Sequence, residues 1–157
     1  LGTGAVTNNG TIIVNRDNTA SVTFAAITGT GTYTQDGGSV IFNAVNSFPG
    51  PTVINGGTLQ LNGGGANGGL RGVVTLNSGA TLRSNNTDTL GYTVGTKVNT
   101  LNINGGTLDH LTANNLTLAS MTINMMVPSV TCIPWKPVKI KKVAPYTPAS
   151  SVKPSSW

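Results

Sequence analysis

Apolar and polar residues alternate along several stretches of the chain, which is the pattern of β-strands with one buried face. The alternation is clearest in residues 100–104, 116–118 and 121–125, and residues 59–62 follow it. Successive side chains of a strand point to opposite sides, so the apolar positions are expected to face one interior. Gly-Gly and Asn-Gly pairs separate the stretches, and both residue types accept turn conformations at low cost. The pattern predicts short strands joined by tight turns.

A short string recurs along the chain as Gly-Gly-Thr-Leu or a close variant, at residues 56–59, 79–82 and 105–108. Residues 2–10 also match residues 29–37 at five of nine positions. We take as a marker the residue just before the Ser or Thr that follows each of these turns. The markers fall at positions 10, 38, 57, 80 and 106, with spacings of 28, 19, 23 and 26. We expect the glycines at these turns to form the corners of the repeat: Gly10, Gly37, Gly38, Gly50, Gly56, Gly57, Gly79, Gly105 and Gly106.

Two all-β architectures bury such faces: an antiparallel sandwich or barrel, and a solenoid whose coils stack. A sandwich needs no similarity between its strands, whereas recurrence of one string implies equivalent corners lying above one another. Stacked coils pair as parallel strands about 4.8 Å apart. The sequence therefore favours a parallel β-solenoid, and a stack of five or six coils is short enough to be a slice of a longer array.

Composition supports the all-β prediction. Among 157 residues there are 21 Gly, 24 Thr and 18 Asn, Glu is absent, and charged residues make up 8%. Helices favour Ala, Leu, Glu, Lys and Arg, whereas Thr suits strands and Gly and Asn suit turns. An ordinary helical or α/β domain is excluded on these grounds.

Charge divides the chain into two parts. Residues 1–126 hold four basic and four acidic residues, so the net charge of +5 comes from five lysines in residues 127–157. That segment also has six of the eight prolines and no glycine or asparagine. We expect a β-solenoid repeat region at 1–126 and a Pro/Lys-rich tail at 127–157, either an extended non-globular linker or a spurious end of the gene. A basic tail can attract anionic membranes or nucleic acid, but the linker is favoured and no nucleic-acid partner is expected.

Residues 29–42 and 46–61 together resemble the autotransporter-associated β-strand repeat. They contain a glycine-threonine start, a Gly-Ser-apolar strand, an Asn-Ser-aromatic turn and a closing Gly-Thr-Leu. The resemblance covers residues 27–61 closely and residues 1–15 and 73–125 weakly, and it does not reach the tail. Pro49, Pro51 and the insertion at 43–45 depart from the pattern and change the turn between its halves.

The resemblance implies a right-handed parallel β-helix in the passenger region of a secreted or cell-surface protein of a Gram-negative-type bacterium. A full-length protein of this kind carries a signal peptide upstream and an outer-membrane translocator barrel downstream. The repeat is associated with efficient secretion of large passengers.

Candidate chemistry is sparse. The four aspartates are not placed by the repeat in one column, so paired-carboxylate catalysis is not expected. His110 follows Asp109 and is expected to face solvent, and Cys132 is expected to be incidental. Residues 63–72 lack the Lys-Ser/Thr of a phosphate-binding loop and are expected to form a flexible excursion. We predict no enzyme activity, catalytic residue, cofactor or metal.

Two functions remain open at this point. The first is a structural passenger segment, a β-helical scaffold that aids secretion and display. The alternative is an adhesin or a module that binds carbohydrate or a host surface through columns of Asn, Thr and Tyr. Tyr33 and Tyr92 are the tyrosines of residues 1–126, so this alternative depends on their exposure.

Overall fold

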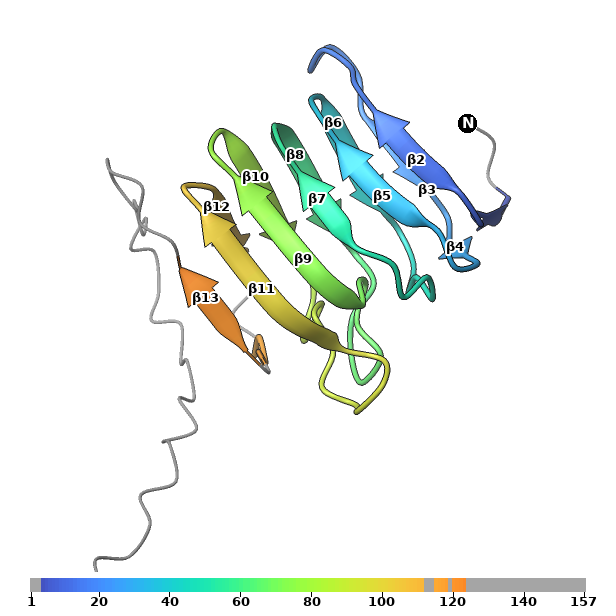
Figure 1. Ribbon diagram of the computed structural model, residues 1–157, viewed down its shortest axis with the longest axis vertical. Coiled ribbons are helices and arrows are strands. Elements are labelled where there is room, and N and C mark those ends of the chain that lie inside the picture. Colours follow the sequence, from blue (N-terminus) through green and yellow to red (C-terminus); the bar gives the residue numbers. More distant parts are fainter. Residues whose placement is uncertain (1–3, 112–114, 119, 124–157) are drawn as a thin grey trace, which may run out of the picture.

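The chain folds as a parallel β-solenoid of about 5 turns (Figure 1). The computed structural model describes residues 4–111, 115–118 and 120–123, and within them there are strands and loops but no helix. The all-β parallel solenoid predicted from the sequence is confirmed, and the antiparallel sandwich is excluded because every strand pair in these residues is parallel. The expected tail at 127–157 lies outside the described residues.

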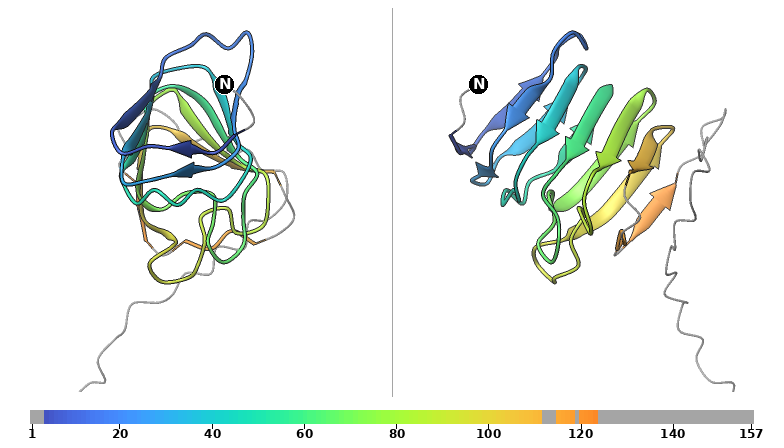
Figure 2. Two further views of the ribbon diagram at one scale, coloured as in Figure 1. Left: turned by 90° about the vertical axis from the view of Figure 1, so that its right-hand side faces the viewer. Right: turned by 180° about the vertical axis from the view of Figure 1, so that it is seen from behind.

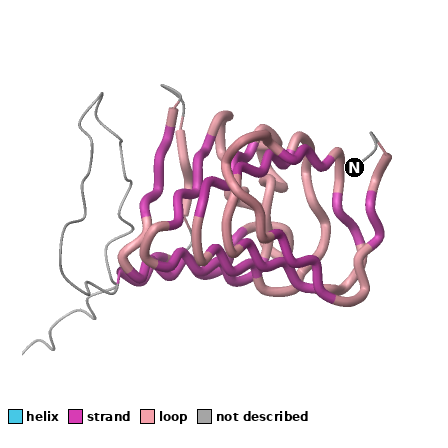
Figure 3. The backbone as a smooth tube through the Cα atoms, turned by 90° about the horizontal axis from the view of Figure 1, so that it is seen from above, coloured by secondary structure: helices cyan, strands magenta, loops and turns pink. Residues whose placement is uncertain are grey.

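Each full coil contributes one strand to each of two sheets, which form separate rows in Figure 3. The first sheet has the order β13-β11-β9-β7-β5-β2, the second has the order β12-β10-β8-β6-β3, and β1 pairs with β4 at one end. The strands are β1 (Val6–Thr7), β2 (Thr11–Val14), β3 (Val22–Phe24), β4 (Ile27–Thr28), β5 (Thr32–Gln35), β6 (Ser39–Phe42), β7 (Thr52–Ile54), β8 (Gly57–Leu61), β9 (Gly72–Asn77), β10 (Ala80–Ser84), β11 (Val98–Asn104), β12 (Thr107–His110) and β13 (Met121–Ile123).

The core lies inside the coils, which superimpose when viewed along the stack (Figure 2, left). Inward positions of successive coils form apolar columns, because parallel pairing in register repeats the same face at every step. One column of the second sheet runs through Val22, Val40, Leu59, Leu82 and Leu108. Val40, Leu59 and Leu82 are fully buried, so the middle of the stack is the best-packed part of this column.

The strand register places four of the five sequence markers in one column, and the first lies outside it. Gly57 pairs with Ala80, and the neighbouring pairs put Gly38 and Gly106 in the same column. Gly10 instead precedes β2 in the other sheet, where Thr11 pairs with Thr32. Residues 6–11 therefore stack at an offset of 21, from the pairs Val6↔Ile27 and Thr11↔Thr32, and not at the offset of 27 given by the sequence match.

Three of the four expected stretches coincide with β8, β11 and β13, but residues 116–118 belong to none of the strands. There the Thr117 N–H and hydroxyl both donate to the Asp88 carboxylate, at 3.0 and 2.9 Å. Asp88 reaches this segment from a left-handed backbone conformation with φ of 48°, which Asp tolerates better than most residues. The segment is held by a loop rather than by a strand ladder, although Leu116 and Leu118 still pack against the core.

Candidate functional site

The corner between the two sheets carries a ladder of polar side chains. At each step the Nδ2 of an asparagine donates to the Oδ1 of the Asn or Asp on the preceding coil. The donor–acceptor distances are 2.7 Å for Asn55 to Asp36, 2.7 Å for Asn77 to Asn55 and 3.1 Å for Asn104 to Asn77. A second ladder at the far end of the second sheet joins Asn62 to Asn43 at 2.8 Å and Asn85 to Asn62 at 3.1 Å. The asparagines of these two ladders therefore bond to one another between coils.

The corner glycines lie beside these ladders. Gly57 has a φ of 74°, and a Cβ atom there would overlap the carbonyl oxygen of Gly38, so this position accepts glycine alone. The other glycines expected at corners lie at strand boundaries: Gly10 precedes β2, Gly37 and Gly38 lie between β5 and β6, Gly50 lies just before β7, Gly56 precedes β8, Gly79 precedes β10, and Gly105 and Gly106 join β11 to β12.

The four aspartates lie apart, and each carboxylate has its own hydrogen-bond or ion-pair partner. Hydrogen bonds from the Thr19 hydroxyl and amide hold the pKa of Asp17 below its usual value. Asp109 pairs with Arg83 at 3.0 Å on the outer face of the second sheet, while Asp36 and Asp88 are engaged as described above. Within the residues described here, no cluster of three or more His, Cys, Asp or Glu side chains could hold a metal ion. Cys132 lies outside that part of the chain.

His110 is not on the solvent side, where the sequence places it. It pairs in register with Ser84, and its Nδ1 lies 2.8 Å from the Ser84 Oγ. Leu108 points inward, and His110, two residues later in the same strand, therefore points toward the interior as well. The Thr89 hydroxyl also donates to Ser84 Oγ at 2.8 Å, and the Ser84 side chain is fully buried. A serine hydroxyl enclosed in this way is not presented to a substrate, so the contact joins two coils.

Tyr33 is not an exposed platform for sugars. It is fully buried, and its ring meets those of Phe42 and Phe24 edge to face, with centroids 5.0 and 6.5 Å away. Its hydroxyl donates to Gln35 Oε1 at 3.0 Å, and burial raises its pKa well above the usual value. The sequence interpretation placed Tyr33 on the wrong side of its strand, because the column through Ile12, Tyr33 and Thr52 points inward.

Two long loops protrude from one side of the solenoid, near the foot of the molecule in Figure 1. The first, residues 62–71, joins β8 to β9, and the second, residues 85–97, joins β10 to β11. The first includes most of the stretch predicted to be a flexible excursion, and it is hydrogen-bonded to the second: the Gly65 N–H donates to the Thr87 carbonyl at 2.9 Å and the Tyr92 N–H to the Ala66 carbonyl at 3.0 Å. At the tip of the second loop Tyr92 is 52% exposed and Val94 is 86% exposed. These loops carry the exposed aromatic side chain that Tyr33 does not provide.

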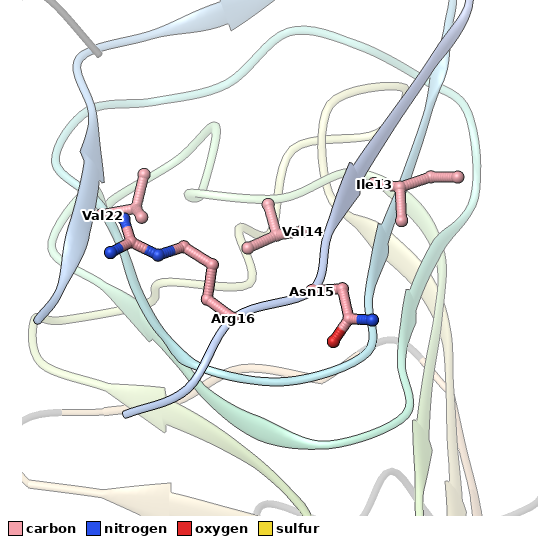
Figure 4. Close-up of a pocket in the computed structure, with 5 residues that line it drawn as sticks. All are labelled: Ile13, Val14, Asn15, Arg16 and Val22. Atoms are coloured by element: carbon pink, nitrogen blue, oxygen red, sulfur yellow. The ribbon is translucent and has the colours of Figure 1, made fainter. Parts of the chain in front are cut away.

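The end of the stack at β2 and β3 is open. A shallow cavity of about 260 Å³ lies there, lined by Ile13, Val14, Asn15, Arg16 and Val22 (Figure 4). Both strands are edge strands of their sheets, so one side of each backbone has no strand neighbour among the described residues. A parallel strand laid on this edge would continue the same ladders.

The fold and these contacts define a parallel β-solenoid whose polar side chains mainly connect its own coils. No protein-family model, no curated protein and no solved structure matches the chain. Among the residues the structure describes, there is no helix long and apolar enough to cross a membrane.

Proposed function

We propose that the chain is a structural passenger segment of an exported surface protein of the autotransporter type, a β-helical scaffold that aids secretion and display. The observation that carries the proposal is the in-register column of Gly and Asn corners, in which asparagine amides bond from coil to coil. Such a stack grows one coil at a time, because each coil contacts only its neighbours. A segment emerging from a membrane can therefore fold progressively.

The proposal places the protein outside the cell, attached to the outer membrane of a Gram-negative-type bacterium or released from it. Its expected partner is the translocator domain of the full-length protein. The repeat resemblance of residues 27–61 supports this setting, and so does the fact that most of the exposed residues in the described part of the chain are Thr, Asn or Gly. The proposal assigns no reaction and no cofactor to the chain.

Protease shaving of intact cells that produce the protein tests this function. An antibody against the whole chain should detect it on the surface, and external protease should remove the signal before lysis. The Gly57→Ala variant, which blocks a corner, should lower the surface yield at least several-fold relative to Gly10→Ala, where a Cβ atom would meet nothing within 4 Å. A signal protected until lysis, or equal surface yields for the two variants, would contradict the proposal.

A second candidate, an adhesin or carbohydrate-binding module, is favoured by one observation. Tyr92 and Val94 are exposed together on a loop that is hydrogen-bonded to its neighbour. Surface aromatic side chains on ordered loops commonly serve in recognition.

A further inference from the structure

One corner of the solenoid, beside the two protruding loops, carries two basic residues at matching positions of neighbouring coils. Arg71 immediately precedes Gly72 in β9, and Lys97 immediately precedes Val98 in β11. Gly72 and Val98 are register partners, and the Gly72 N–H donates to the Lys97 carbonyl at 3.3 Å. The ladder therefore fixes the two basic residues as neighbours, at a backbone spacing of about 5 Å.

Among the described residues, neither cation has an acidic partner within ion-pair distance. Within residues 4–111, 115–118 and 120–123 the ion pair with N···O within 4.0 Å is Arg83–Asp109. Arg71 is half-buried, and its Nε is fully buried without a hydrogen-bond acceptor in the part of the chain that the structure describes. A guanidinium keeps its charge at physiological pH, and a buried N–H without an acceptor is unfavourable. Two like charges held on adjacent coils indicate a place for an anionic group.

The loop beside this corner is already ordered. The amides of Thr96 and Lys97 both donate to the Thr93 carbonyl at 3.1 Å, and the Thr96 hydroxyl donates to Asn67 Oδ1 at 3.0 Å. The exposed Tyr92 and Val94 belong to this same loop. A surface held in this way loses little conformational freedom on binding.

We propose that this corner binds the carboxylate of an acidic sugar, such as a uronic acid unit of a glycan. Arg71 would donate to the carboxylate in the forked geometry that suits planar anions, with Lys97 as the second cation. The aromatic face of Tyr92 would contact the sugar ring, and the hydroxyls and amides of the two loops match sugar hydroxyls. Because residues 1–126 have no net charge, the body lacks the broad positive field that attracts nucleic acid. This site does not depend on the scaffold function. It would give the second candidate function, an adhesin or carbohydrate-binding module, acidic sugars as its ligand class.

Calorimetric titration of the full chain with an oligogalacturonate, and with the matching neutral galactose oligomer, tests the site. We expect saturable binding of the acid that weakens with added salt, and none of the neutral sugar. Arg71→Gln and Lys97→Gln should each weaken binding about tenfold or more. Tyr92→Ala should also weaken it.

Arg16→Gln is the matched control, because it removes the same charge from an exposed position at the open end and should leave binding unchanged. Circular dichroism of each variant checks that it remains folded. Absence of binding to the acid, equal binding of the neutral sugar or of inorganic phosphate, or full affinity in a folded Arg71→Gln variant would overturn the proposal. Protease shaving of cells is an independent readout, so failure of this site is distinguishable from failure of the scaffold function.

Discussion

Asn46 shows how single buried polar residues connect the coils. It is 1% exposed, its Oδ1 accepts the Ile27 N–H at 2.7 Å, and its Nδ2 donates to the Gly69 carbonyl at 2.7 Å. One side chain thus joins three successive turns of the chain. Buried polar groups with partners of this kind define a unique arrangement, whereas unpaired ones are costly.

Thr52 is the contrasting case. It is fully buried in the first sheet, and its hydroxyl has no hydrogen-bond partner among the residues that the structure describes. Replacing the hydroxyl by a methyl group in Thr52→Val should raise the free energy of unfolding by about 1 kcal/mol, because a desolvated unpaired hydroxyl is removed.

Urea unfolding followed by circular dichroism measures this change. Thr75→Val, on the outward side of β9 where the side chain is only partly buried, is the control and should change stability by less than about 0.5 kcal/mol. A loss of stability in Thr52→Val would show that its hydroxyl has a partner.

The sequence predicted only in part which side chains point into the core. Alternation correctly groups Tyr33 with Gln35, but both residues look like surface residues in a Thr-rich strand, and both are fully buried. His110 also has the polarity of a surface residue, but it shares the inward face of its strand with Leu108 and is half-buried. Polarity alone misplaces such residues, because an inward polar group is acceptable when its hydrogen bonds are satisfied inside, as the Tyr33–Gln35 and Ser84–His110 contacts show.

At the scale of elements, the corner ladder is the feature that the repeat encodes most directly. A short Asn-Gly-Gly or Asn-Ser-Gly string places one amide per coil at the same corner, where parallel register brings the amides within hydrogen-bond reach. The sequence predicted the turn and its glycines, but the bonds between asparagines followed only from the register.

Asn77→Ala tests the ladder, since it removes the bonds to both Asn55 and Asn104. We expect a loss of about 1 to 2 kcal/mol of stability, the sum of two partly exposed hydrogen bonds. Hydrogen exchange should show faster opening of β9 and β11. Asn99→Ala, at an exposed position of β11, is the control and should have little effect; equal losses in the two variants would mean that the ladder contributes nothing specific.

The first coil shows why the sequence match failed at the element scale. Gly-Thr-Gly and a later Gly dominate the match of residues 2–10 to 29–37, yet residues of this kind begin many turns. In the structure residues 6–7 form β1, which pairs with β4, whereas residues 32–35 form β5 of the first sheet. The sequence match therefore aligns strands of different sheets, because short Gly-Thr identities show that a turn is present but not which turn of the coil it is.

At the scale of the whole molecule, the sequence predicted the solenoid because the coil spacings of 19, 23 and 26 are the spacings at which β6, β8, β10 and β12 stack. It did not predict that the loops at 62–71 and 85–97 bond to each other. Their contacts join backbone groups, such as the Gly65 amide and the Thr87 carbonyl, that leave no pattern in side chains. The basic corner at Arg71 and Lys97 was missed for the same reason, since their spacing of 26 residues has meaning only once the register is known.

Disulfide trapping in a Cys132→Ser background tests the stacking of coils most directly. Asn55 and Asn77 bond to each other on adjacent coils, so Asn55→Cys with Asn77→Cys should form a bridge under mild oxidation, because their backbones lie about 5 Å apart. Asn55→Cys with Asn104→Cys, two coils apart, should not, since that distance exceeds the reach of a disulfide. Bridging in the adjacent pair alone is the predicted result, and no bridge in either pair, or equal bridging in both, would contradict the solenoid.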